Sequence, residues 1–385
     1  MGGSGGLASI GAGLTLITVF TLGACRQAPP VSLAPAPSVD TAVATARRAD
    51  SARAHTARFY QSLPYGSEAQ FNPISLIVNG GYDQLRTGQN RRIFEYPYRT
   101  SFNTVWRSLT HPDAVIRHYG VRRWLRNEVF PLSAKGEGGG QWYPNYHLHL
   151  FGAGATYVET VEWYEQHGTS HPELAAGATV YAWHLLTEVV ENGNHCCEDE
   201  DGLTDLALFD AASIVLWNQE WVRRQFGRTV ELKSWMGQPS LSAPGGTLEN
   251  AYMMAMLRIA IPGATNWRAI NTFGNAFLFG VSRRIGSEYW LSPTVGFDPA
   301  DNPIIDPVTG AKTVTLKPNV GLFLDRRGSL LVSAISKGGS TNGVTVNVYP
   351  FTRTMPGIWF QHVNGGGARF GVVSPVGLGV GWFAR

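Results

Sequence analysis

The C-terminal part of the chain alternates between apolar residues and small or polar residues with a period of two. In Val376–Trp382 the apolar side chains alternate with glycine, and in Val344–Val348 valine alternates with threonine and asparagine. This period is typical of β-strands, because successive side chains along a strand point to opposite faces of a sheet. Turn sequences such as Asp325–Gly328 separate the runs. We therefore predict roughly eight antiparallel strands in residues 231–385.

The two faces of these predicted strands differ in polarity. In Thr272–Gly280 the three phenylalanines fall on one face, and threonine, alanine and glycine fall on the other. An apolar outer face and a small or polar inner face are typical of a membrane β-barrel. The alternative is a water-soluble sandwich or barrel with an apolar core, since alternation alone does not identify the wet face. We predict a membrane-associated antiparallel barrel.

Before residue 231 the apolar residues recur with the period of α-helices. The first predicted helix runs from His147 to His167, and Gly168 is its C-terminal cap. The second spans residues 170–191 and the third spans residues 201–226. The predicted fold class is therefore α+β, with a helical bundle at about residues 145–227 packed in or on a C-terminal barrel of roughly eight strands.

Composition divides the chain into five predicted segments. The first is a signal segment, the second a tether rich in proline and alanine with a surface helix, and the third an initial folded segment with short strands and a helix. The three-helix region and the strand region follow. Their bounds are 1–24, 25–65, 66–144, 145–230 and 231–385.

The N-terminus resembles that of bacterial lipoproteins. Leu7–Leu22 is apolar and uncharged, and it leads into Leu22-Gly23-Ala24-Cys25. This sequence resembles the lipobox, in which the cysteine is acylated. No lysine or arginine precedes the apolar run, so a basic leader is missing. We predict an outer-membrane lipoprotein that faces the periplasm, with the lipid bilayer as partner of acylated Cys25. The alternative is an ordinary cleaved signal or a membrane anchor.

Charge and composition narrow the function classes further. The 385 residues are 44% hydrophobic and only 15% charged, and the formal net charge is +3. This charge is too small for a nucleic-acid-binding domain, and no basic cluster interleaved with aromatic residues occurs. Low charge with many glycines and aromatic residues indicates extensive strand structure or a membrane-facing surface. We therefore predict no nucleic-acid partner.

The predicted helices carry charge within apolar sequence. Buried charge is costly unless it is paired or coordinated, so a functional site is expected here. His184 and Glu188 lie on one face of the second helix, and Glu159 and Glu162 lie on the first. These four are candidate catalytic residues, as general acid and base or around a divalent metal. The alternative is a buried hydrogen-bonded network that ties the helices to the barrel wall. The charged residues of this region are His147, His149, Glu159, Glu162, Glu165, His184, Glu188, Glu191, Asp205 and Asp210.

A loop dense in acidic residues precedes the third predicted helix. Asp199, Asp201 and Asp205 match ligand positions of a calcium loop, but Cys197 and Leu208 stand where its first and last ligands belong. We consider these three aspartates as a candidate calcium or zinc site. The alternative is a solvated loop that caps the helix. No other cofactor is predicted.

Several motifs resemble a family of uncharacterised bacterial outer-membrane-associated lipoproteins, which is known as a domain-of-unknown-function group. They include Asn79–Asp83, Glu162–Glu165, His184–Asn192 and Asp205–Asp210. The resemblance covers residues 71–383. It implies an envelope protein in which strands enclose helices, and it implies no catalytic residues.

Three functional hypotheses follow. The first is a lipid-anchored envelope protein with a structural or binding role. The second is an envelope enzyme that acts on lipid or cell-wall material through the histidine and glutamates of the helices. The third is an accessory subunit of a larger membrane complex, with other envelope proteins as partners. Lipidation of Cys25 and metal content would distinguish among them.

Overall fold

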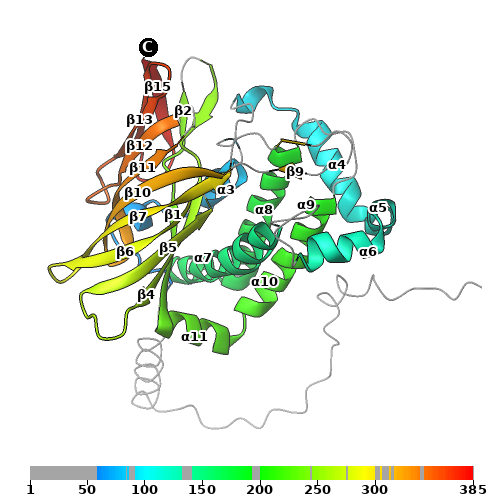
Figure 1. Ribbon diagram of the computed structural model, residues 1–385, viewed down its shortest axis with the longest axis horizontal. Helices are drawn as coiled ribbons and strands as arrows, with labels where there is room; N and C mark the ends of the chain where they lie inside the picture. Colours follow the sequence, from blue (N-terminus) through cyan, green and yellow to red (C-terminus); the bar gives the residue numbers. More distant parts are fainter. Residues whose placement is uncertain are drawn as a thin grey trace, which may run out of the picture. The chain divides into compact units, whose positions relative to one another are not determined.

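A long β-sheet lies beside a group of helices in the computed structural model of the chain (Figure 1). The described residues all belong to one compact unit of the chain. The predicted signal segment and tether, the lipidation residue Cys25 and the acidic residue Asp199 lie outside the described residues. The structure describes residues 59–83, 85, 92–131, 141–192, 200–242, 245–274, 276–299, 304–305, 312–313, 316–338 and 342–384.

The helices precede most of the sheet in the chain. Several are π-helical, among them η4 and η5, in which hydrogen bonds join residues five apart. None of the helices in the described part of the chain combines the length and hydropathy that a membrane crossing requires. The bounds are α2 (Gly66–Ala69), α3 (Pro73–Gly81), η2 (Ile93–Glu95), α4 (Tyr98–Thr110), α5 (Pro112–Tyr119), α6 (Val121–Trp124), η3 (Leu125–Val129), η4 (Tyr143–Ala153), α7 (Gly154–Gln166), α8 (Pro172–Asn192), α9 (Glu200–Thr204), η5 (Asp205–Phe209), α10 (Asp210–Trp217) and α11 (Glu220–Thr229).

The three predicted helices differ from the observed ones mainly at the third. Helices η4 and α7 follow one another without a break, and Gly168 just beyond them has a φ of 74°, as expected of a cap. The third predicted helix is interrupted at Gln219, whose backbone is extended. Beside the break, the side chain of Asn218 accepts a hydrogen bond of 3.0 Å from the Tyr157 hydroxyl. A separate helix, α11, therefore begins after the break and leads into strand β1.

Within the described residues, one sheet contains thirteen strands in the order β1-β4-β5-β6-β7-β10-β11-β12-β13-β14-β15-β2-β3. Neighbouring strands are antiparallel except β15 and β2, which are parallel. Strands β8 and β9 form a separate pair. The bounds are β1 (Val230–Met236), β2 (Ser240–Ser242), β3 (Thr247–Glu249), β4 (Met253–Ala260), β5 (Trp267–Gly274), β6 (Phe277–Ile285), β7 (Tyr289–Pro299), β8 (Ile304–Ile305), β9 (Lys312–Thr313), β10 (Leu316–Arg326), β11 (Ser329–Lys337), β12 (Asn342–Val348), β13 (Gly357–Val363), β14 (Ala368–Val373) and β15 (Gly379–Ala384).

The prediction of a closed barrel of about eight strands is wrong. The sheet is open, because its end strands β1 and β3 do not pair with one another, and it is mixed rather than purely antiparallel. Alternation identifies strands, but closure depends on strand number, tilt and stagger, which alternation does not encode. The edges are instead covered by helices. Strand β1 packs against α7 and α11, and Leu248 of β3 belongs to an apolar cluster that also contains Val190 of α8.

The sheet has apolar side chains on its exposed face and many polar side chains on its buried face. On β10, Val320 is 56% exposed and Leu322 is 47% exposed, whereas Asn319 and Asp325 are buried. On β7, Val295 is 64% exposed and its neighbour Thr294 is buried. The exposed face therefore differs from that of a water-soluble sheet, whose polar face meets solvent. The buried face mixes these polar residues with an apolar cluster that includes Trp235, Leu278 and Phe323.

The strand register joins the outward apolar residues into continuous rows. Phe279 of β6 lies opposite Val295 of β7, which lies opposite Val320 of β10. A longer row crosses six neighbouring strands. It consists of Leu322, Ala334, Val346, Phe360, Phe370 and Trp382. We call the outward residues of β6, β7 and β10–β15 the outer sheet face.

The buried face of the sheet holds a paired charge. Arg258 and Asp325 are completely buried and form an ion pair, and Arg258 also contacts Glu231 at 3.1 Å. Burial raises the pKa of Asp325 to about 6, although the Arg258 guanidinium opposes the rise. The Arg258 Nε donates to Ser282 Oγ at 3.1 Å, so the guanidinium has partners on several strands. The charged pair is therefore held within a polar, hydrogen-bonded interior.

Candidate functional site

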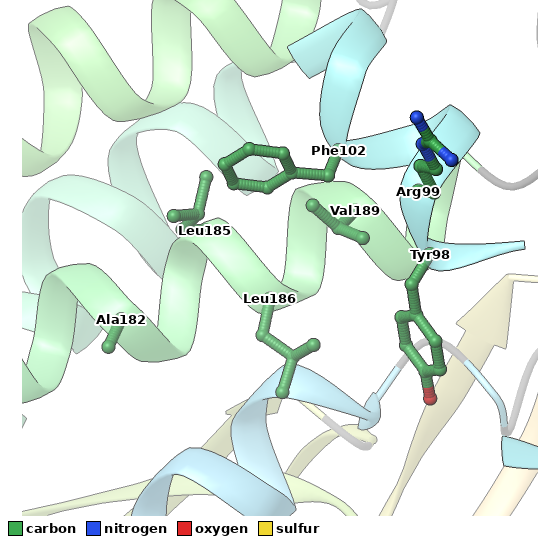
Figure 2. Close-up of a pocket in the computed structure, with 7 residues that line it drawn as sticks. All are labelled: Tyr98, Arg99, Phe102, Ala182, Leu185, Leu186 and Val189. Atoms are coloured by element: carbon green, nitrogen blue, oxygen red, sulfur yellow. The ribbon is translucent and has the colours of Figure 1, made fainter. Parts of the chain in front are cut away.

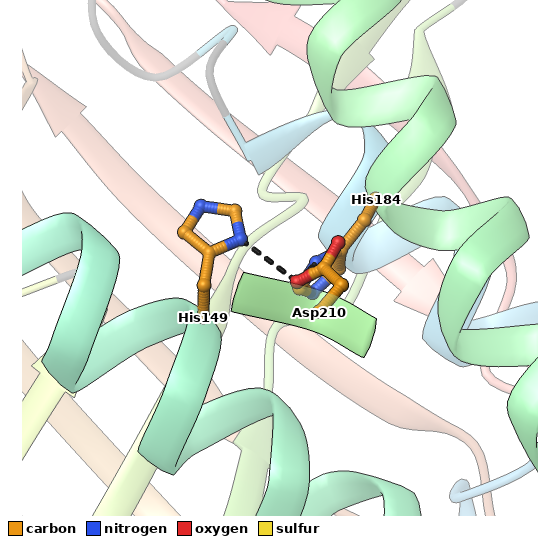
Figure 3. A group of neighbouring side chains, drawn as sticks. All are labelled: His149, His184 and Asp210. Carbon is orange, nitrogen blue, oxygen red and sulfur yellow. Dashed lines mark hydrogen bonds and ion pairs between the residues drawn. The ribbon is translucent and has the colours of Figure 1, made fainter. Parts of the chain in front are cut away.

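Two histidines and three carboxylates meet among the helices, and we call this group the helical centre. His149 lies on η4, and His184 and Glu188 lie one turn apart on α8. Asp205 is the first residue of η5, and Asp210 is the first residue of α10. Figure 3 shows the Asp210 carboxylate between the rings of His149 and His184. Four separate elements therefore supply the group.

Short contacts connect the members of the helical centre. Asp210 Oδ1 lies 3.0 Å from His149 Nδ1 and 2.6 Å from His184 Nδ1. The other ring nitrogen of His149, Nε2, lies 3.2 Å from Asp205 Oδ2. Glu188 offers an oxygen within 4.8 Å of the ligand atoms of His149 and Asp205. His149 therefore bridges two aspartates, and Asp210 bridges two histidines.

A π-helical turn brings the two aspartates together. The backbone N–H of Asp210 donates to the carbonyl of Asp205, a hydrogen bond between residues five apart. In a regular α-helix such residues point in different directions, whereas a π turn returns the chain to the same side after five residues. The local winding of η5 thus places both carboxylates beside His149.

The electrostatics of the centre are dominated by burial and by charge pairing. Burial alone lowers the pKa of His149, but the charge of Asp210 and the hydrogen bond to it outweigh burial and raise the pKa. Burial lowers the pKa of His184, and Asp210 only partly opposes this. Burial raises the pKa of Asp210, but the charges of the two histidines reverse the shift and lower it. His149 is therefore the histidine that more readily holds a positive charge.

Asp205 lies where negative charge accumulates. Burial raises its pKa well above the usual value, and the carboxylates of Asp201, Asp210 and other acidic residues raise it further. Nearby, Gln141 Nε2 donates to Glu128 at 3.2 Å and to Asp201 at 2.8 Å. Burial, followed by the charge of Asp201, raises the pKa of Glu128 to about 8. The centre therefore adjoins a second group of buried carboxyl groups.

The arrangement is suited to hold a proton or a cation. Two overlapping sets of side chains have ligand atoms within 4.8 Å of one another, namely His149 with His184 and Asp210, and His149 with Glu188 and Asp205. Imidazole nitrogens and carboxylate oxygens are ligands of divalent transition metals. The same contacts form a chain of alternating acidic and basic groups along which a proton can be shared.

The structure divides the predicted catalytic residues between two places. His184 and Glu188 belong to the helical centre. Glu159 and Glu162 lie elsewhere, where Ser234 N donates to Glu159 at 3.1 Å and Tyr60 N donates to Glu162 at 2.8 Å. These bonds tie α7 to strand β1 and to the segment before α2.

The predicted metal residues are also divided. Asp199 lies outside the described residues. Asp201 accepts the hydrogen bond from Gln141, whereas Asp205 contacts His149. Of the two described aspartates, Asp205 takes part in the helical centre.

Two members of the centre, His149 and Asp210, could not be assigned to it by spacing within one helix. Each stands on an element different from that of His184. The available signal was chemical, since both are ionisable residues in the apolar sequences Tyr146–Phe151 and Leu206–Leu216. Ionisable residues in apolar helices are candidates for a shared site.

A separate apolar groove lies between α4 and α8, with a volume of about 440 Å³. Figure 2 shows its walls, to which α4 contributes Phe102 and α8 contributes Leu185 and Val189. None of the five residues of the helical centre lines this groove. The groove therefore offers apolar contact and no acid–base chemistry from the centre.

Comparisons of the chain with protein-family models, curated proteins and solved structures found no match. The resemblance to outer-membrane-associated lipoproteins stays a prediction. We therefore infer function from the geometry of the helical centre and from the polarity of the sheet.

Proposed function

We propose that this chain is an envelope protein that associates with a lipid bilayer through the outer sheet face and has a structural or binding role. The single observation that carries the proposal is the polarity of the sheet. Exposed rows of apolar residues cover a buried face that contains the Arg258–Asp325 ion pair. Large apolar surfaces on soluble monomers are uncommon, and they mark sites that meet a partner or a membrane.

The dimensions of the outer sheet face support contact with hydrocarbon. On β10 the outward residues from Leu316 to Leu324 are all apolar, and they cover about 26 Å at about 3.3 Å per residue. The apolar band of membrane β-proteins is about 25 Å tall. On β15, Val380 and Trp382 point outward while Gly381 is buried.

The covered edges remove the main objection to an open sheet at a bilayer. Unpaired strand edges are not tolerated in hydrocarbon, because their backbone groups lack partners. Here the edge strands β1 and β3 pack against helices, and Arg92 forms an additional backbone bridge with Thr247 of β3. The proposal assigns the bilayer contact to the strands between these edges.

An acyl group on Cys25 would strengthen the association. An acyl anchor and an apolar protein surface each add to membrane affinity. The outer sheet face is the second contribution in this proposal. Metabolic labelling with palmitate tests the anchor, and label that persists after Cys25→Ser would contradict it.

Flotation with phospholipid vesicles tests the sheet contribution separately. The full chain with Cys25→Ser removes any acyl group, and Val320→Asp and Phe360→Asp place charge on the outer sheet face. Leu174→Asp is the matched control, because Leu174 is an exposed apolar residue on helix α8. We expect Cys25→Ser protein and the control to float, and the two sheet variants to lose at least half of the floating fraction.

Two outcomes would overturn the proposal. One is equal flotation of the sheet variants and the control. The other is failure of the Cys25→Ser chain to float with vesicles even when its outer sheet face is unchanged. If the sheet variants instead lose a co-purifying protein and never bind vesicles, the accessory-subunit hypothesis is favoured.

A further inference from the structure

The helical centre contains carboxylate oxygens that lack partners. Among the described residues, Oδ1 of Asp205 and Oδ2 of Asp210 have no hydrogen-bond partner. Their side chains are only 6% and 1% exposed. The second oxygen of each carboxylate contacts His149. A buried carboxylate oxygen without a donor is unfavourable, and a cation is one of the few groups that satisfies it.

The geometry points to a binding site for one divalent transition-metal cation in the helical centre. We propose His149, His184 and Asp210 as its ligands, because their ligand atoms lie within 4.8 Å of one another. Asp210 contacts Nδ1 of His149, whereas Asp205 contacts Nε2 on the other side of the ring and orients the imidazole. Asp210 Oδ1 lies 3.0 Å from His149 Nδ1 and 2.6 Å from His184 Nδ1. Zinc bonds to nitrogen and oxygen are about 2.0–2.2 Å, which requires ligand atoms no more than about 4.2 Å apart. Small rotations of these side chains would place their ligand atoms at bonding distance around a cation.

The ligand types define the class of metal. Calcium and magnesium prefer oxygen ligands alone, whereas the two imidazoles favour zinc or another late first-row metal. The site is closed, since all five side chains are largely buried and four elements converge on it. Three protein ligands leave one position of a tetrahedral zinc ion for water or another ligand. The cation would therefore join η4, α8 and α10.

Metal titration of the full chain tests this inference independently of the bilayer proposal. The probe is Zn²⁺, added to detergent-purified protein after chelation and followed by calorimetry and elemental analysis. The background carries Cys25→Ser, Cys196→Ser and Cys197→Ser, so that thiols cannot bind the probe. We expect one equivalent of Zn²⁺ per chain, and binding of Mg²⁺ at least tenfold weaker.

Substitutions locate the binding. Asp205→Asn keeps the shape of the side chain and is expected to weaken Zn²⁺ binding at least tenfold. His184→Ala is expected to abolish it. Glu159→Gln is the matched control, because Glu159 is a buried carboxyl group that contacts Ser234 and not the centre. Circular dichroism checks that each variant is folded.

The pattern of Zn²⁺ binding among these variants tests the proposed site. Loss of binding in folded Asp205→Asn but not in Glu159→Gln supports it. Equal binding in both, no binding of Zn²⁺ by the parent chain, or tighter binding of Mg²⁺ than Zn²⁺ would overturn it. If His184→Ala does not fold, Asp205→Asn alone decides.

Discussion

The sheet and the helices each bury charge, but they balance it differently. Inside the sheet, Arg258 pairs with Asp325, and both side chains are completely buried. In the helical centre, the ion pairs of Asp205 and Asp210 among the described residues are made with histidines. One group therefore contains a permanent cation, and the other relies on imidazoles.

This difference separates a structural pair from a candidate binding site. A guanidinium stays charged at any physiological pH, so the sheet pair neutralises itself without a ligand. An imidazole is neutral over much of that range, so the helical centre needs a proton or a metal to offset its carboxylates. The sheet interior thus specifies a fold, whereas the helical centre has capacity for a ligand.

The largest effect is expected when the sheet pair is broken. Arg258→Met leaves Asp325 buried without its guanidinium, and the expected cost is about 3–5 kcal/mol in the free energy of unfolding. Thermal and denaturant unfolding in detergent measure it. The double variant Arg258→Met, Asp325→Leu is expected to recover most of this loss, because the unpaired charge is gone. If the double variant is no more stable than Arg258→Met, the view that Arg258 and Asp325 neutralise one another is contradicted.

A third buried carboxyl group, that of Glu159, is expected to make stability depend on pH. Burial raises the pKa of Glu159 to about 8 from its usual 4.5, and Lys233 only partly opposes the rise. Between these values the folded chain holds a proton that the unfolded chain has released. Stability should therefore fall as pH rises from about 4.5 to about 8, by about 5 kcal/mol at most from this group.

Glu159→Gln is expected to remove that part of the pH dependence, because the amide still accepts from Ser234 and does not titrate. Unfolding curves at pH 5 and pH 8.5 compare it with the parent chain. The variant should be relatively more stable at the higher pH. An unchanged slope would show that Glu159 is charged in the folded chain at pH 8.5 without cost.

A smaller effect of opposite sign is expected at the helical centre. Asp205→Asn removes a buried carboxyl group whose ionisation is disfavoured by burial and by nearby carboxylates, and it should stabilise the metal-free chain at pH 8. The same change should weaken Zn²⁺ binding. Thermal unfolding with and without a chelator measures both. If Asp205→Asn instead destabilises the protein in the presence of a chelator, the charge of Asp205 is already neutralised without a cation.

The sequence predicts the strands better than it predicts their assembly. Alternation in Val344–Val348 and Val376–Trp382 depends on neighbouring residues, so it is visible in the chain. Whether β1 meets β3 depends on the curvature of thirteen strands and on helices that cover both ends. These are long-range properties that no local pattern records. The outward direction of the apolar face is likewise a property of packing.

The helical centre was predictable only in part for a similar reason. His184 and Glu188 are four residues apart, so their common face follows from helical geometry. Asp205 and Asp210 share a side because η5 is a π-helix, and His149 arrives from another element. Glu159 follows His149 along the chain but points toward β1. Regular α-helical spacing therefore led to the prediction of Glu159 as a site residue, whereas the packing of the helices places His149 in the centre.

The measurement that tests the central claim most directly is fluorescence quenching of Trp382 by brominated phospholipids. Trp382 lies on the outer sheet face and stacks on Phe370, whereas Trp235 is fully buried on the opposite face. The signal of Trp382 is the difference between the Cys25→Ser chain and the same chain with Trp382→Phe, and Trp235→Phe is the control. We predict that brominated vesicles strongly quench the Trp382 signal and leave the Trp235 signal largely unchanged. A Trp382 signal that brominated lipid leaves intact and aqueous iodide quenches would contradict the bilayer assignment.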